Sequence, residues 1–215
     1  MYVFNPCPCG APHEGRYPRP MPAERTRRDA ARNRDLLVAA ARRAFAAHGP
    51  DVPLEDIASE AGVSRTTLHR HFANREALAS AVLEQNVADI EARAAGLADA
   101  DDGAERLFHY LLDVQFEAPW LGRVVADGRM PGTADLGTRT AAALDPLLDR
   151  ARERGRVHPG VTTDDVLLTL PMVMAVQAAT AATAGGGTPS RVGATRALLH
   201  RGVFTTEPPT APSAG

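Results

Sequence analysis

Two short helical segments joined by a glycine turn constrain this sequence more than any other feature. Residues 53–72 read PLEDIASEAGVSRTTLHRHF. Pro53 favours the start of a helix, and the acids that follow complement the helix dipole. Gly62 allows a tight turn because glycine adopts a positive φ without steric cost. Ser64 is a good N-cap for the next helix, so the stretch predicts two helices that meet at a tight turn.

The second of these helices has an apolar and a polar face. Leu68 and Phe72 lie four residues apart and are expected to turn toward the core. The side chains left on or near the exposed side are Arg65, Thr66, Thr67, His69, Arg70 and His71. This arrangement is typical of a helix-turn-helix, whose second helix enters the DNA major groove. The alternative is a solvated polar face of an ordinary small helix.

The exposed side chains have chemistry that fits DNA. Arginine pairs with guanine O6 and N7, and the threonine methyl contacts the thymine methyl. We therefore expect Arg65, Thr66 and Thr67 to read bases. His69, Arg70 and His71 lie further along the helix and are better placed for phosphates.

The charge is divided unevenly along the chain. Residues 16–76 hold 12 arginines against 8 acids, whereas residues 77–215 hold 12 arginines against 17 acids. A basic first part followed by an acidic second part is expected when only the first part meets a polyanion.

A longer helix is predicted before the turn, over residues 23–48. Leu37, Ala41 and Phe45 repeat at helical spacing on one apolar stripe. Gly49 ends the helix in the usual C-terminal capping role.

The stretch LEDIASEAGVSRTTLHRHFANREAL resembles the DNA-binding signature of the tetracycline-repressor (TetR) family of bacterial transcriptional regulators. The resemblance covers about residues 30–80. The residues that match the family signature are Ile57-Ala58, Ala61-Gly62-Val63, Leu68, His71-Phe72 and Glu76-Ala77-Leu78.

Two positions depart from the family pattern. His69 stands where the family usually has tyrosine, and Arg75 where it commonly has lysine. Both positions are associated with phosphate contact, and Arg75 preserves the charge near the start of the next helix. We expect Arg75, together with Arg27 and Arg28 of the helix at 23–48, to hold the DNA backbone.

The resemblance implies an all-α protein of about nine helices, with an N-terminal three-helix domain and a C-terminal ligand-binding and dimerisation domain. The expected divisions are a disordered extension at 1–21, the helix-turn-helix domain at 22–80, the ligand-binding and dimerisation domain at 81–206, and a disordered tail at 207–215. Beyond the turn, we expect helices at about 74–95, 107–116, 134–154, 163–184 and 190–205, the fourth kinked at Pro171.

The C-terminal part contains large, adaptable apolar side chains: Phe108, Leu111, Leu112, Phe116, Trp120, Met130, Met172 and Met174. Such residues line ligand cavities, and they also form ordinary cores. The resemblance implies a cavity between these helices, so we expect this set to bind a small-molecule effector.

Two further faces of this part are candidates for a subunit interface. Residues 175–184 are rich in alanine, and residues 197–204 have an apolar face. Packing against their copies would form a four-helix bundle in a homodimer. A monomer would instead bury the same faces internally.

The sequence gives little support for a secreted, metal-binding or membrane protein. Two cysteines make no disulfide framework and no secretory leader is recognised, so we expect a cytoplasmic chain. Cys7, Cys9 and His13 give at most three closely spaced ligands, so no metal site is expected. The apolar run at 166–182 contains Pro171 and reads as a buried helix rather than a membrane span.

Motifs of catalysis are absent from the sequence: there is no phosphate-binding glycine loop, HExxH, GxSxG or CxxC. We therefore predict no enzymatic activity and no cofactor. The sequence is interpreted as a homodimeric, ligand-responsive repressor that leaves a double-stranded, pseudo-palindromic operator when a small apolar or amphipathic effector binds. The alternative is a DNA-binding activator or architectural protein without an effector.

Overall fold

The structure, a computed structural model, describes residues 23–118, 120, 133–182 and 188–209. The N-terminal extension, Met130 and the last six residues therefore lie outside the described part. Within it, the regular elements are helices, apart from one isolated bridge between Val157 and Phe204. The helices are α1 (Ala23–His48), α2 (Leu54–Glu60), α3 (Arg65–His71), α4 (Arg75–Gly96), α5 (Gly103–Glu117), α7 (Thr133–Glu153), α8 (Thr163–Ala182) and α9 (Thr188–Val203). The all-α prediction is confirmed.

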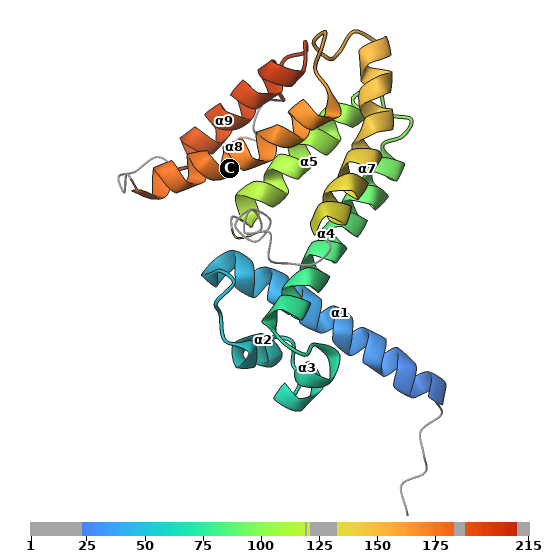
Figure 1. Cartoon of the computed structure of the whole chain (residues 1–215), viewed down its shortest axis with the longest axis vertical. Coiled ribbons are helices and arrows are strands. Elements are labelled where there is room, and N and C mark those ends of the chain that lie inside the picture. The colour runs from blue at the N-terminus through green and yellow to red at the C-terminus, as the bar shows by residue number, and fades with distance from the viewer. Residues whose placement is uncertain (1–22, 119, 121–132, 183–187, 210–215) are drawn as a thin grey trace, which may run out of the picture.

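The first three helices form one end of the molecule, and α5 to α9 form the other (Figure 1). At the first end, α1 ends at His48 and is followed by Gly49, whose φ is +82°. Apolar residues of α1 to α4 form one buried cluster, which includes Leu37, Phe45, Ile57 and Leu68. This cluster holds α2 and α3 against α1.

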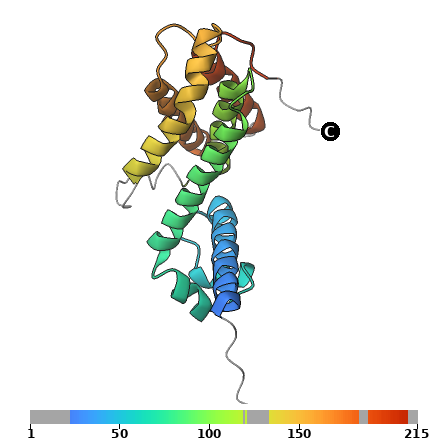
Figure 2. The same ribbon diagram turned by 90° about the vertical axis from the view of Figure 1, so that its right-hand side faces the viewer.

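Helix α4 joins the two ends of the molecule (Figure 2). Its first half contributes Leu78, Val82 and Leu83 to the N-terminal cluster. Its second half contributes Ile90 and Ala94 to a second buried cluster. One helix is therefore part of both cores, and the expected domain boundary at residues 80 and 81 falls within it.

The C-terminal end is built around α5. Leu107, Phe108 and Leu112 have no exposed surface, and they pack with apolar residues of α4, α7, α8 and α9. Helix α7 continues through Pro146, and α8 continues through Pro171 as one helix. Helices α8 and α9 lie along the outer side of this bundle (Figure 1).

In the described part of the chain, no helix combines the length and the apolar character needed to cross a membrane.

Candidate nucleic-acid interface

Helix α3 is fixed by its cap, its turn and two buried side chains. Ser64 Oγ accepts a hydrogen bond from the Thr67 backbone N–H at 3.1 Å, which confirms the predicted N-cap. Gly62 has a φ of +68°, in the left-handed region that glycine tolerates. Leu68 is fully buried and Phe72 is 3% exposed. These contacts determine which side of α3 faces outward.

Four of the residues predicted to contact DNA are exposed on α3: Arg65, Thr66, His69 and Arg70. They present a guanidinium and a hydroxyl at the start of the helix, and an imidazole and a second guanidinium one turn later. A helix with this exposed set offers donors both for base edges and for phosphates.

Thr67 and His71 are half-buried. The Thr67 hydroxyl lies 2.9 Å from Ser64 Oγ and so takes part in the helix cap. The His71 ring lies 6.5 Å from the Phe72 ring, and its Nε2 is buried without a hydrogen-bond partner within the described residues. Both side chains therefore lie closer to the core than the four exposed residues of α3.

Arg75 at the start of α4 is also half-buried. Its Nη1 donates to the backbone carbonyl of Pro50 at 2.5 Å and to that of Val52. These bonds tie the start of α4 to the loop between α1 and α2. The Arg75 guanidinium, which was predicted to contact a phosphate, thus uses part of its N–H donors within the protein.

Arg27 and Arg28 lie exposed near the start of α1. This end of α1 and helix α3 lie at the same end of the molecule, away from α8 and α9 (Figure 1). The two arginines are thus placed at the end of the molecule that carries the helix-turn-helix.

Two residues that were not predicted take part in this region. Asn74 Oδ1 accepts from the Ala77 backbone N–H at 2.8 Å and caps α4. An asparagine just before an acidic first turn is a recognised helix-start signal. Glu55 of α2 lies 3.1 Å from Arg65, between Oε1 and Nη1. This ion pair could not be predicted from the sequence, because it depends on how α2 and α3 pack in the folded chain.

The residues predicted to line an effector cavity are only partly brought together. Phe108, Leu111 and Leu112 are buried in the C-terminal cluster, and Phe116 packs half-buried against it. Met174 is half-buried on α8. The exposed fraction of Met172 is 54%, and Met130 lies outside the described residues.

Trp120 lies apart from this set. Its ring packs edge-on against Phe45 of α1, with ring centroids 4.9 Å apart, and only 2% of the residue is exposed. Trp120 and Ala118 belong to the N-terminal cluster, although they follow α5 in the chain. Two residues just after α5 are therefore packed into the core of the helix-turn-helix domain.

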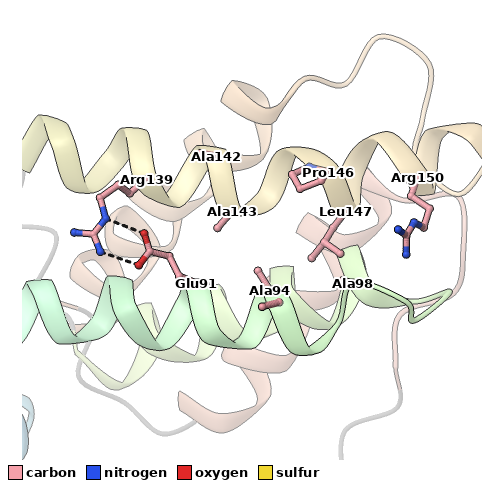
Figure 3. A pocket seen from close by; sticks show the side chains of 10 residues that line it. Glu91, Ala94, Ala98, Arg139, Ala142, Ala143, Pro146, Leu147 and Arg150 are labelled. Carbon is pink, nitrogen blue, oxygen red and sulfur yellow. Dashed lines mark hydrogen bonds and ion pairs between the residues drawn. The ribbon is translucent and has the colours of Figure 1, made fainter.

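A groove of about 370 Å³ lies between α4 and α7 (Figure 3). At one end Arg139 pairs with Glu91 through two hydrogen bonds of 2.7 and 2.8 Å. The lining residues are Glu91, Ala94, Ala95, Ala98, Arg139, Ala142, Ala143, Pro146, Leu147 and Arg150. None of them belongs to the predicted effector-binding set.

A buried pair of histidines connects α5 with α9. His109 Nε2 lies 3.0 Å from His200 Nδ1, and His200 Nε2 lies 3.0 Å from the Thr206 carbonyl oxygen. Because that carbonyl only accepts, His200 carries its proton on Nε2, and the neutral His109 donates from Nε2 to His200 Nδ1. Burial and the neighbouring His200 lower the pKa of His109 to about 4. Burial also lowers the pKa of His200.

The fold and this surface define a helix-turn-helix protein with an added helical domain. The family model described as "Bacterial regulatory proteins, tetR family" matches residues 37–82. No curated protein matches the sequence.

Solved structures extend the likeness beyond the helix-turn-helix. A TetR transcription regulatory protein from Mycobacterium vanbaalenii is 28% identical with a TM-score of 0.57, over 71% of this chain and 95% of that one. A TetR transcriptional regulator from Streptomyces coelicolor is 26% identical with a TM-score of 0.61, over 83% and 99%. A gamma-butyrolactone receptor (ArpA-like protein) is 23% identical with a TM-score of 0.54, over 82% and 91%. The helix-turn-helix part of the chain thus matches the tetR family of bacterial regulatory proteins, and TetR transcriptional regulators share its fold over most of its length.

Proposed function

We propose that this regulator is a homodimeric repressor that leaves a pseudo-palindromic operator when a small apolar or amphipathic molecule binds. The observation that carries the proposal is the exposed face of α3. There Arg65, Thr66, His69 and Arg70 face outward from a helix that is capped at Ser64 and anchored by buried Leu68. Two such helices, one DNA turn or about 34–36 Å apart, would enter successive major grooves.

The exposed residues would have different tasks on DNA. Arg65 and Thr66 read base edges, with Thr67 beside them at the cap. The backbone contacts fall to His69, Arg70, His71, Arg27 and Arg28. Arg75 holds the loop before α2, and its remaining N–H groups would be left for a phosphate.

Apolar side chains exposed on α8 and α9 support the proposal of a dimer. Leu168 and Met172 on α8 are 60% and 54% exposed, and Leu198 on α9 is 65% exposed. Large apolar side chains left on neighbouring helices are typical of a surface that another subunit covers. Leu199, Val203 and Phe204 are buried within the subunit, so only part of the predicted apolar face of α9 remains for the partner.

The effector is proposed to bind beside α5, where Phe116 packs half-buried against the apolar core that includes Phe108, Leu111 and Leu112. Met174, half-buried on α8, is proposed to take part as well. One protein of the same fold is described as a gamma-butyrolactone receptor. At 23% identity that likeness concerns the fold alone, so the apolar character of the effector is inferred from this chain's own residues. A coupling of about 1–3 kcal/mol between the two sites would change operator affinity several-fold to a hundredfold.

A mobility-shift experiment tests this function. The full-length chain is mixed with the DNA upstream of its own coding region, at two salt concentrations and with nonspecific competitor. A specific shift that weakens with salt is expected, because each phosphate contact releases counterions. Compounds are then screened for release of that complex. A regulator that binds specifically and that no compound in a broad apolar library releases would favour the effector-free alternative.

A further inference from the structure

Arg65 is held from two sides on the outer face of the helix-turn-helix. Its Nη1 lies 3.1 Å from Glu55 Oε1 on α2. Its Nε donates to His69 Nε2 at 3.5 Å, one turn along α3. The guanidinium therefore has one partner on each of the two helices.

We propose that Glu55 is a specificity-determining residue that orients Arg65 for reading guanine, with His69 as the second support. This proposal rests on the proposed base-reading role of Arg65. Glu55 itself need not touch a base, so it is a positioning residue.

Enough donors remain on Arg65 to read a base while it stays held. A guanidinium has five N–H groups. The hydrogen bond to His69 uses the one on Nε, and the ion pair with Glu55 uses at most one on Nη1. At least three N–H groups remain, two of them on Nη2, and a bidentate contact with guanine O6 and N7 requires two.

The positions of α2 and α3 are fixed well enough for this support to act. The backbone N–H of Val63 donates to the Ala58 carbonyl at 3.0 Å, and that of Gly62 donates to the Ser59 carbonyl at 3.0 Å. Ile57 and Leu68, one on each helix, are fully buried. Glu55 therefore presents its carboxylate to α3 from a helix whose position relative to α3 is fixed.

Two physical effects make Glu55 favour specific over nonspecific DNA. An exposed arginine loses rotamer freedom when it binds a base, and ordering it beforehand reduces that cost. A carboxylate beside the DNA-facing surface also repels phosphates, which weakens binding that relies on charge alone. Both effects increase the ratio of specific to nonspecific affinity.

Glu60 provides a matched control. It lies on the same helix and forms a similar exposed ion pair, with Arg43 of α1 at 2.7 Å. This pair does not involve α3. Glu60→Gln therefore removes the same charge from α2 and leaves the contact between Glu55 and Arg65 intact.

The experiment measures sequence preference with the full-length chain. Selection from random duplex DNA first yields the preferred sequence of the wild-type protein. Affinities are then measured for that sequence and for duplexes in which each guanine is replaced in turn. The guanine read by Arg65 is the one at which Arg65→Ala loses its discrimination, by about tenfold or more.

At that guanine, Glu55→Gln is expected to reduce discrimination by about two- to fivefold, the range of an exposed ion pair. Binding to random competitor should become tighter at the same time, whereas Glu60→Gln should leave discrimination at this guanine at the wild-type value. In an Arg65→Ala background, Glu55→Gln should cause no further loss of discrimination, because the group that it orients is gone. Thermal melting checks that each variant is folded.

The outcomes separate this proposal from the proposed function. Equal discrimination by Glu55→Gln and Glu60→Gln, or an increase with Glu55→Gln, would overturn the role of Glu55 while base reading by Arg65 stands. If the wild-type chain selects no sequence, or if Arg65→Ala selects the same sequence as wild type, the proposed base reading fails first and the role of Glu55 with it.

Discussion

Lowering the pH is expected to destabilise the C-terminal domain through His109. The pKa of this imidazole is about 4 in the folded chain and 6.5 in an unfolded reference. Burial is the first cause, because the charged ring would lose its hydration. Between pH 6.5 and 4 the His109 imidazole is therefore protonated in the unfolded chain and neutral in the folded chain. The free energy of unfolding consequently falls as the pH is lowered.

The size of the effect follows from proton linkage. Stability is unchanged by this group above about pH 7.5, where the ring is neutral in both states, and it is lost progressively between pH 6.5 and 4. With these two pKa values, the free energy of unfolding at pH 5 is about 2 kcal/mol lower than at pH 8. The lowered pKa of His200 acts in the same direction.

The assay is chemical denaturation at fixed protein concentration between pH 8 and 5, compared with His109→Gln. Glutamine keeps an N–H donor toward His200 and does not titrate. The variant should lose the part of the pH dependence that His109 contributes, about 2 kcal/mol between pH 8 and 5, even if its stability at pH 8 is lower. His48→Gln, at the exposed end of α1, is the control and should keep the wild-type slope. Parallel curves for wild type and His109→Gln would refute the reasoning.

Three further changes test other parts of the molecule. Trp120→Ala should destabilise the helix-turn-helix core by about 3–5 kcal/mol, measured by denaturation followed by circular dichroism. A loss of stability below about 1 kcal/mol would contradict the burial of this ring. Arg75→Ala should lower stability by about 1–3 kcal/mol, because two loop carbonyls lose their donor, and an unchanged melting temperature would argue against the loop contact. The same variant should bind specific and nonspecific DNA more weakly, by similar factors. Leu198→Asp should shift the chain from dimer to monomer in sedimentation experiments, and a dimer of wild-type affinity would place the interface elsewhere.

Much of the helix-turn-helix could be predicted because its signals are local. The cap at Ser64 and the turn at Gly62 depend on residues within four positions of each other. The anchors Leu68 and Phe72 follow from helical spacing alone. Such features are set by backbone geometry and by the pattern of apolar residues, so they can be recognised in a sequence.

The contacts that the sequence did not reveal join residues far apart in the chain. Trp120 packs on Phe45, 75 positions away, and nothing near the tryptophan indicates which core it joins. Arg75 donates to carbonyls 23 and 25 residues earlier. From the sequence, an arginine at the start of a helix is interpreted equally well as a phosphate ligand. The packing of the whole chain determines these partners.

The position of Trp120 also bears on how the protein can be divided. A fragment that ends within α4 would contain the whole helix-turn-helix, yet it would lack the indole that covers Phe45. The side of Phe45 that the indole covers would then be exposed to solvent. The helix-turn-helix is therefore not a module that can be transplanted alone, and a chimera that keeps its core intact needs Trp120 as well.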